Sequence, residues 1–408
     1  MSIRLDSVLL FAFVIPFIMT YRISPLETPF WLFGLIFLGL LTYIVLDLLK
    51  LNLKRYYFLK QIVLWSLIVV VIGSAFISAI IVRHQTSPIY NIHDIVIQQE
   101  SGIRFLLDGV NPYAVTYFGT PLEQWNYSDI EVNPALYHFV MQPFYLIFAL
   151  PFYFFSNLIF GFFDGRIPLL FLFLSLLIMA AYLIKDKEKR LLFLILLAFN
   201  PAMLSYTLEG RSDIFMFAFL FASFYLLTKG KLFLAGIPMG LAFAVKQSAW
   251  PILPLYVAFL FLKTKKLKET AKNLFPLALT FLAILSPFLL WDYRSFLDST
   301  IFYLSGSAPN SYPISGYGFG KLLNQMGLIK DAYQYFPFHI IQLVAGLPLF
   351  WVLYAFLKKN LSVGRLILSY GIFLLVFWYF SRYFNNSHLA YLSVVFITAY
   401  FWPQEEKT

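Results

Sequence analysis

The longest polar interval in this chain runs from Asn91 to Pro134 and reads NIHDIVIQQESGIRFLLDGVNPYAVTYFGTPLEQWNYSDIEVNP. Its acidic side chains are Asp94, Glu100, Asp108, Glu123, Asp129 and Glu131. Apolar runs of transmembrane character flank it on both sides, so we expect a loop at a membrane surface. An acidic loop in a basic, apolar chain is the first place to look for chemistry.

The composition predicts a polytopic membrane protein, and the succession of apolar runs predicts an all-α bundle of about 12–14 transmembrane segments with an outer loop that carries interfacial helices. Of its 408 residues, 61% are apolar and 20% aromatic, while only 12% are charged, about half the usual share. There are no cysteines, which excludes disulfides, thiolate metal sites and cysteine nucleophiles. The net charge of +10 comes from short clusters between apolar runs. Such clusters are typical of topology signals, so no nucleic-acid partner is expected.

The organisation fits a single membrane domain over residues 1–408. An extra N-terminal helix pair (1–60) is expected before a core (61–262), and C-terminal helices (263–408) include an outer loop at 292–335. The basic residues Lys50, Lys54, Arg55 and Lys60 are interpreted as a cytoplasmic connector. The next run, Ile62–Val82, is expected to cross the membrane outward.

The basic clusters predict the orientation. With Lys185–Arg190 and Lys263–Lys272 in the cytoplasm, the polar interval faces the non-cytoplasmic side. With this orientation, the chain is on the outer face both before and after Ala135–Phe163. The segment must therefore leave the outer face and return to it, as a hairpin of two short helices kinked at prolines. A single crossing there would place the basic clusters outside, which the charge rule disfavours.

Ionisable residues outside the basic connectors collect at this outer edge: His93, Asp94, Arg104, Glu209, Arg211, Asp213, Lys246, Arg382 and His388. Charges near lipid are costly unless they meet each other or water, so the gathering indicates a functional site. The alternative is that short outer loops hold ordinary solvated charges. That alternative is weaker for Lys246, which directly follows the apolar run Leu232–Val245.

Asp94 begins a predicted interfacial helix, Asp94–Leu107, directly after His93. The carboxylate could act as a general base or share a metal ion with the imidazole. Alternatively Asp94 is simply the helix N-cap, and the local sequence favours that interpretation.

Arg211 and Lys246 offer a planar fork and a point charge that suit a phosphate group. For Arg211, a salt bridge to Glu209 or Asp213 is an equally good interpretation. The segment SRYFNNSHL at Ser381–Leu389 adds Arg382 at the same edge. No nucleotide-binding motif and no H-E-x-x-H occurs, so the donor of any transferred group is expected to be membrane-borne.

Four blocks follow one another in the order LLDGVNPY (106–113), NPALYHFVMQP (133–143), NPAMLSYTLEGRSD (200–213) and GLAFAVKQSAWPILP (240–254). Their order resembles the GT-C superfamily of integral-membrane glycosyltransferases. Within it, the chain is most similar to the prokaryotic polyprenyl-phosphate-mannose-dependent mannosyltransferases. The chain departs from that pattern at His93, where a paired acidic motif is absent, and at Asn133, which replaces an aromatic residue.

The resemblance implies a GT-C-like core and an inverting glycosyltransferase (EC 2.4 class) at the non-cytoplasmic face of the cell membrane. Its donor would be a polyprenyl-phosphate hexose, with mannose favoured, and its acceptor a lipid-linked or other glycan in contact with membrane lipids. Asp94 would be the catalytic base, with Arg211, Lys246 and Arg382 at the donor phosphate. The residues predicted to contact substrate are His93, Arg104, Tyr113, Asp213, Gln247 and His388. No metal ligand is assigned, although the chemistry allows a divalent ion.

Two other classes of function stay open. A transporter or flippase of lipid-linked glycans would need no catalytic base, but transporters tend to show internal repeats and discontinuous helices at the membrane midplane. Neither feature is clear in this sequence. A structural membrane scaffold would not require Lys246 or Arg382 at the ends of apolar runs.

Overall fold

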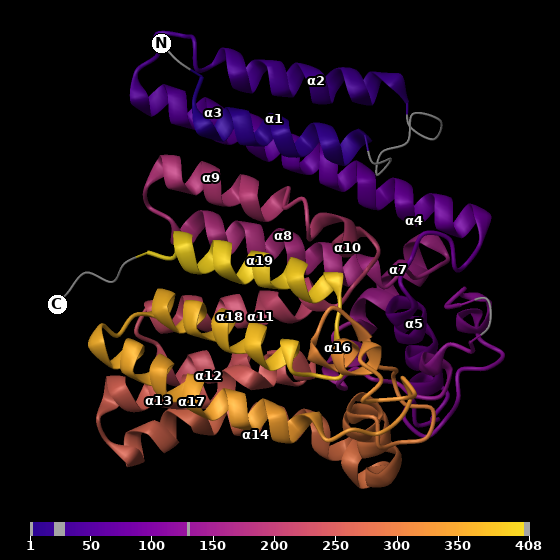
Figure 1. The fold of residues 1–408 in the computed structure, drawn as a ribbon. Helices are drawn as coiled ribbons and strands as arrows, with labels where there is room; N and C mark the ends of the chain where they lie inside the picture. The colour runs from indigo at the N-terminus through magenta and orange to yellow at the C-terminus, as the bar shows by residue number, and fades with distance from the viewer. Residues whose placement is uncertain (1–2, 20–28, 129–130, 404–408) are drawn as a thin grey trace.

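The computed structural model describes residues 3–19, 29–128 and 131–403, and Figure 1 shows them as helices lying side by side in layers. Apart from helices, the described residues form one parallel bridge between β1 (Ser315–Gly316) and β2 (Tyr383–Phe384). The predicted all-α fold class is therefore confirmed. Asp129 of the polar interval lies outside the described residues.

The helices indicate a membrane protein. Four stretches are long and apolar enough to cross a bilayer: Leu53–Thr86, Arg166–Leu183, Leu267–Ser305 and Phe338–Lys359. Shorter apolar helices accompany them: Leu5–Phe17, Phe30–Val45, Phe144–Phe160, Asp213–Thr228, Leu232–Phe243 and Val363–Tyr379. The number of 12–14 transmembrane segments stays a prediction, because length and composition identify only the first four as full spans.

Helix α11 (Asp213–Thr228) forms the centre of the bundle and packs against α8 (Arg166–Leu183) and α12 (Leu232–Phe243). Helix α12 packs in turn against α14 (Leu267–Leu297). Two glycines one turn apart permit this close approach. A Cβ on Gly236 would lie 2.9 Å from the Leu277 nitrogen, and one on Gly240 would lie 2.7 Å from the Leu277 oxygen. Small residues at this spacing bring membrane helices into backbone contact.

The C-terminal helices complete the layers of Figure 1. Helix α18 (Val363–Tyr379) packs against both α17 (Phe338–Lys359) and α19 (Asn386–Phe401). Helix α13 (Leu253–Thr264) packs beside α14, α17 and α18. Helix α9 (Lys187–Ala198) packs beside α8 and α19.

The N-terminal helices α1 (Leu5–Phe17) and α2 (Phe30–Val45) precede one continuous helical stretch. That stretch comprises α3 (Leu53–Leu67), a π-helical segment η2 (Ile68–Gly73) and α4 (Ser74–Thr86). Contacts between α1 and α9 attach these helices to the rest of the bundle.

The predicted basic connector is wrong in part, because Lys60 is not a solvated charge. Lys60 is fully buried, with its Nζ 2.8 Å from Asp6 Oδ2 and 2.7 Å from Asp47 Oδ1. Lys54 and Arg55 lie in the first turn of α3 rather than in a loop. The expected crossing at Ile62–Val82 is accordingly part of a longer helix that begins at Leu53.

The polar interval begins with α5 (Asp94–Leu107), whose bounds match the predicted helix. Unlike a helix lying on a membrane surface, α5 is buried from Ile95 through Ile103. Short 3-10 helices η3 (Pro121–Gln124) and η4 (Pro134–Leu136) follow.

The predicted hairpin at Ala135–Phe163 is not formed. The segment contains α6 (Phe144–Ile147) and α7 (Leu150–Phe160), which join into one interrupted stretch. Seventeen residues span only about 25 Å, which is short for even one full crossing.

Polar connections gather at one end of the bundle, on the right in Figure 1, beside α5. They include α10 (Leu204–Leu208), η5 (Gln247–Ile252), η6 (Asp298–Phe302), α15 (Tyr303–Ser305) and α16 (Phe319–Gln325). Asp292 breaks α14 with non-helical angles (φ −158°, ψ 93°), where the predicted outer loop 292–335 begins.

Candidate functional site

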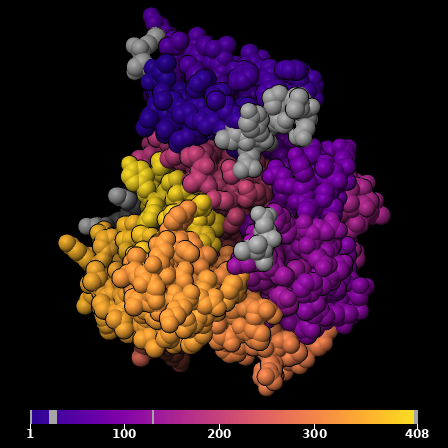
Figure 2. Space-filling model, turned by 45° about the vertical axis from the view of Figure 1, so that its right-hand side comes forward, coloured from indigo at the N-terminus to yellow at the C-terminus, as the bar shows by residue number. Residues whose placement is uncertain are grey.

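A cavity of about 670 Å³ lies at this polar end of the bundle. Its lining comes from the start of α5, the α10–α11 turn, the α12–η5 junction, the loop after α15 and the start of α19. Figure 2 shows the segment after α5 and the last third of the chain as adjoining flanks of the same face. Of the predicted site residues, His93, Asp94, Arg211, Asp213, Lys246, Gln247, Arg382 and His388 line this cavity.

His93 and Asp94 form a close pair at the start of α5. The N-cap position belongs to His93, and Asp94 is the first residue of the helix, so the interpretation of Asp94 as the N-cap is wrong. His93 Nδ1 lies 2.6 Å from Asp94 Oδ1 and 3.3 Å from the Ile95 amide nitrogen. One ring nitrogen cannot both donate to the carboxylate and accept from the amide. The shorter, charge-assisted contact is the stronger, so Nδ1 carries the proton and donates to Asp94.

The Asp94 carboxylate is held ionised at neutral pH. Burial alone would raise its pKa, but the His93 imidazole and the Arg211 guanidinium favour the charged form and the net pKa is lowered. The Asn133 amide also lies beside the carboxylate. Its Nδ2 is buried without a hydrogen-bond partner among the described residues, so we attribute to it a weak effect only.

Arg211 presents its guanidinium to the cavity from the turn between α10 and α11. Its Nε lies 3.6 Å from Glu209 Oε2, beyond hydrogen-bonding distance, and makes no hydrogen bond within the described chain. The guanidinium stacks over the Tyr206 ring at 4.6 Å. Asp213 does not pair with it, so the salt-bridge interpretation of Arg211 has only the loose contact with Glu209.

Lys246 instead pairs with Asp213, at 2.6 Å between Nζ and Oδ1. The Asp213 side chain is only 4% exposed, whereas that of Lys246 is 21% exposed on the cavity side. An ammonium group has three donors, so this contact leaves Lys246 able to bind a second anionic group. Gln247 donates from Nε2 to the carbonyls of Val140 and Thr300 and thereby joins two walls of the cavity.

The Arg382 side chain is held by hydrogen bonds to backbone carbonyl groups. Its guanidinium donates to the carbonyl oxygens of Tyr312, which precedes α16, and of Ala332 and Gln334, which follow it. It is 3% exposed, and burial lowers its pKa to about 10. These contacts hold the loop in place, and they make Arg382 a poorer candidate for a phosphate ligand than Arg211.

His388 lies at the start of α19 against the Trp378 ring, with ring centroids 4.5 Å apart. Its Nδ1 accepts a hydrogen bond from the Asn385 amide at 3.0 Å. In the neutral imidazole, Nε2 therefore carries the proton and is a donor. His93 and His388 thus have opposite tautomers.

Arg104 and Tyr113 lie outside the described lining of the cavity. Arg104 Nε contacts the Glu100 carbonyl on its own helix, at 3.3 Å. Tyr113 is buried, and its hydroxyl donates to the Met141 carbonyl at 2.8 Å. The structure therefore does not bring these two residues together with Asp94.

Aromatic residues complete the cavity, and the sequence did not single them out. Trp125, Tyr127, Tyr303 and Tyr312 all line it. Aromatic faces of this kind pack against sugar rings and lipid chains alike. In a chain with 27 tyrosines and 8 tryptophans, aromatic character alone carries no signal that could identify these four.

Within the part of the chain that the structure describes, no group of three or more His, Asp or Glu side chains could hold a metal ion. The strong cations that line the cavity are Arg211, Lys246 and Arg382, and of these Arg382 is already held by three backbone carbonyls.

Comparison with protein families matches residues 139–400 to the model of Glycosyltransferase family 87. The matched residues include Arg211, Lys246, Arg382 and His388, whereas His93 and Asp94 precede them. No curated protein and no solved structure matched the chain.

Proposed function

Because the chain belongs to glycosyltransferase family 87, it is a sugar-transferring enzyme, and we propose that its donor is a polyprenyl-phosphate hexose. Mannose is the favoured sugar, on the resemblance of the four sequence blocks. The acceptor is a lipid-linked glycan or another glycan, and transfer inverts the anomeric carbon. We place the reaction at the non-cytoplasmic face of the cell membrane, in a multi-pass protein.

The observation that carries this proposal is the meeting of Asp94 and Arg211 in one cavity. An ionised carboxylate and a guanidinium whose Nε lacks a hydrogen-bond partner among the described residues line the same space. The two are close enough for the charge of Arg211 to lower the pKa of Asp94. A base and an anion-binding group are the two requirements for displacing a phosphate from a sugar.

In the proposed reaction, Asp94 accepts the proton of an acceptor hydroxyl as that oxygen attacks the anomeric carbon. A new glycosidic bond forms while the bond between the anomeric carbon and the phosphate oxygen breaks. The polyprenyl phosphate leaves with the electron pair, and Arg211 and Lys246 stabilise its charge. His388 supplies a neutral N–H donor to a substrate oxygen.

A membrane-borne donor fits the rest of the molecule. The sequence contains no nucleotide-binding motif, and the cavity lies at the end of a bundle of apolar helices. A polyprenyl chain would lie among such helices while its phosphate reaches the polar end. The reaction needs no nucleotide, and a divalent ion is optional.

The test uses purified protein with membrane lipid extract and one of two labelled donors, polyprenyl-phosphate mannose or a nucleotide-linked mannose. We expect label to move to an acceptor only from the polyprenyl donor. Transfer from the nucleotide-linked sugar alone would overturn the proposed donor. A parallel incubation with EDTA measures whether a divalent ion is required.

The same preparation in sealed vesicles tests the transporter alternative. A flippase would carry the labelled lipid across the bilayer without forming a new glycosidic bond. Translocation without transfer, in a folded protein, would replace the proposed activity.

A further inference from the structure

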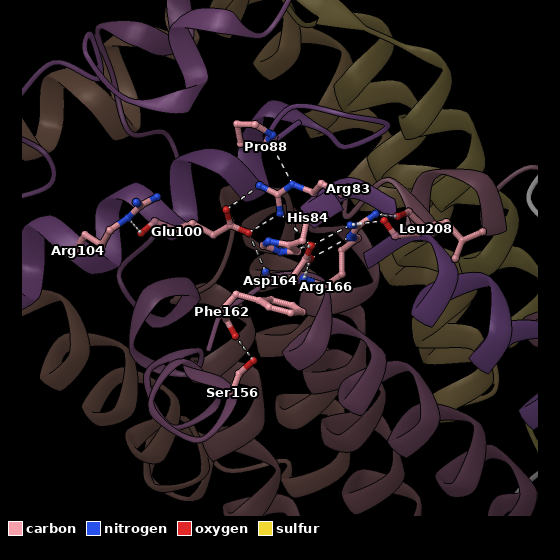
Figure 3. Close-up of polar contacts among 12 residues, drawn as sticks. Arg83, His84, Pro88, Glu100, Arg104, Ser156, Phe162, Asp164, Arg166 and Leu208 are labelled. Atoms are coloured by element: carbon pink, nitrogen blue, oxygen red, sulfur yellow. Dashed lines mark hydrogen bonds and ion pairs between the residues drawn. The ribbon is translucent and has the colours of Figure 1, made fainter. Parts of the chain in front are cut away.

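A buried cluster of four charged residues lies outside the cavity. It consists of Arg83 on α4, Glu100 on α5, Asp164 just before α8 and Arg166 at the first turn of α8 (Figure 3). The four are 1%, 7%, 0% and 0% exposed, respectively. Two cations and two carboxylates give the cluster no net formal charge.

One half of the cluster attaches α5 to its neighbours. Arg83 Nη1 and Nη2 donate to the two oxygens of Glu100 at 2.7 and 2.8 Å, a bidentate pair. Glu100 Oε1 also accepts from the Gly165 amide at 3.1 Å. The helix that begins with Asp94 is thus joined to α4 and to the segment that leads into α8.

The other half continues from Asp164 to Arg166. Arg83 Nη1 lies 2.9 Å from Asp164 Oδ2. Arg166 Nε and Nη2 then donate to the two Asp164 oxygens at 2.9 and 2.8 Å. Figure 3 shows the Arg83 fork directed at Glu100 and the Arg166 fork directed at Asp164.

Arg166 also reaches the turn that carries Arg211. Its Nη1 contacts the Leu208 carbonyl at 3.5 Å, and its stem packs under Gly210, where an added Cβ would lie 3.2 Å from Arg166 Cγ. Gly210 has φ +90° and also faces Val96 of α5, so the turn passes close against both residues.

A backbone hydrogen bond closes the circuit. The His93 amide donates to the Glu209 carbonyl at 2.8 Å, directly beside Asp94 and Arg211. The contacts therefore run from α5 through Glu100, Arg83, Asp164 and Arg166 to the 208–211 turn, and return to the start of α5. The circuit therefore connects the start of α5, which carries Asp94, with the 208–211 turn, which carries Arg211.

We propose that Arg166, held by Asp164, is a positioning residue that sets the distance between Arg211 and Asp94. This rests on the proposed sugar transfer. Replacing a buried ion pair with apolar side chains of similar volume is often neutral or stabilising, so stability alone does not explain a four-charge cluster here. A planar guanidinium holds a carboxylate and a carbonyl in one fixed geometry, and neither an apolar side chain nor a lysine does.

Two variants test the proposal without leaving a charge unpaired. Arg166→Lys keeps the charge but cannot reach both Asp164 oxygens and the Leu208 carbonyl together. The double variant Asp164→Asn with Arg166→Met keeps the cluster neutral and removes the fork. The matched control is Arg190→Met, because Arg190 also donates to a carbonyl, that of Ile184 at 2.7 Å, and lies outside the described lining of the cavity.

The first measurement does not depend on turnover. Hydrogen exchange of the full-length protein in detergent measures the exchange rate of the His93 amide hydrogen, whose bond to the Glu209 carbonyl closes the circuit. We expect exchange at His93 and at residues 208–211 to become roughly tenfold faster or more in both variants, and to stay unchanged in Arg190→Met. Unchanged exchange at His93 in a folded variant, or equal acceleration in every helix, would overturn the proposal.

The second measurement is the pH profile of kcat/KM with polyprenyl-phosphate mannose. Asp94 is faced by His93, Arg211 and Asn133 and by three cavity tyrosines, Tyr127, Tyr303 and Tyr312. Withdrawing the Arg211 cation should raise the pKa of Asp94. The acid limb of the profile should move to higher pH, and kcat/KM at neutral pH should fall about 10- to 100-fold. If activity falls but the acid limb stays at the same pH, the variant has simply lost folded protein. That result would overturn the proposed positioning role of Arg166. If the wild type transfers no sugar, the proposed function fails, while exchange at His93 still decides this inference.

Discussion

Lys246 at the α12–η5 junction forms an ion pair with Asp213 at the start of α11, with Nζ 2.6 Å from Oδ1. The pair joins the start of α11 to the cavity wall formed by residues 246–248. The Asp213 side chain is nearly inaccessible, so its charge depends on this partner. Lys246 therefore has two tasks in our proposal, neutralising Asp213 and binding the donor phosphate.

The two tasks separate in a double variant. Lys246→Met alone should lose transfer and up to about 3–5 kcal/mol of stability, because a buried carboxylate is left without its partner. Lys246→Met with Asp213→Asn should recover the thermal unfolding temperature but not the transfer rate. Recovery of both would show that Lys246 serves only to neutralise Asp213.

Arg211→Gln tests the phosphate site and the charge of the base together. Losing a charge-assisted contact costs about 1.5–3 kcal/mol, which lowers kcat/KM on the order of tenfold or more. Arg211 also lowers the pKa of Asp94, so its removal should move the acid limb of the profile to higher pH. The control Arg190→Gln should leave both quantities unchanged. Full activity of Arg211→Gln at every donor concentration would place the phosphate elsewhere.

Arg382→Lys distinguishes loop anchoring from phosphate binding. Lysine keeps a positive charge but cannot donate to the Tyr312, Ala332 and Gln334 carbonyls at once. We expect faster hydrogen exchange across residues 312–334 and a lower unfolding temperature, at about 1–3 kcal/mol for each buried carbonyl left unpaired. A raised donor KM with unchanged exchange in the loop would instead favour the phosphate role.

The orientation can be tested with single cysteines, because the chain has none of its own. Gln124 and Lys268 are both exposed, in the polar interval and in the most basic connector, respectively. In intact cells Gln124→Cys should react with an impermeant thiol reagent, and Lys268→Cys should react only after permeabilisation. The reverse pattern would place the cavity on the cytoplasmic side.

The sequence predicted local features better than pairings. The predicted helix Asp94–Leu107 has the bounds of α5, and most of the polar edge did assemble around Asp94. The partner of a buried charge is set by packing between distant segments, and one sequence does not contain that information. Lys60 was therefore misread as a solvated connector charge, although it pairs with Asp6 and Asp47.

The same limit applies to the buried cluster and to Arg382. Arg83 and Asp164 are 81 residues apart, and the sequence offers no signal that joins them. Arg382 looked like a free cation because its acceptors are backbone carbonyls, which every residue has. Arg104 was predicted as one of the ionisable residues of the outer edge and Tyr113 as part of the block LLDGVNPY, but neither is in the described lining of the cavity.

Asp94→Asn decides whether the carboxylate does chemistry. Asparagine keeps the shape, and His93 rather than Asp94 occupies the N-cap, so helix capping should be retained. The variant still loses its charged contact with His93 Nδ1, which is partly exposed at 22%, so we expect a small loss of thermal stability. As a general base, Asp94 should contribute about 10²–10⁴-fold to the transfer rate.

The measurement compares single-turnover transfer from polyprenyl-phosphate mannose with the unfolding temperature, for Asp94→Asn and for His93→Asn. Loss of transfer in a stable Asp94→Asn protein is the expected result. Since Nδ1–H of His93 orients the carboxylate rather than accepting the proton, His93→Asn should retain part of the rate. An active Asp94→Asn enzyme would remove Asp94 from the mechanism, and His93 would then be the next base to test.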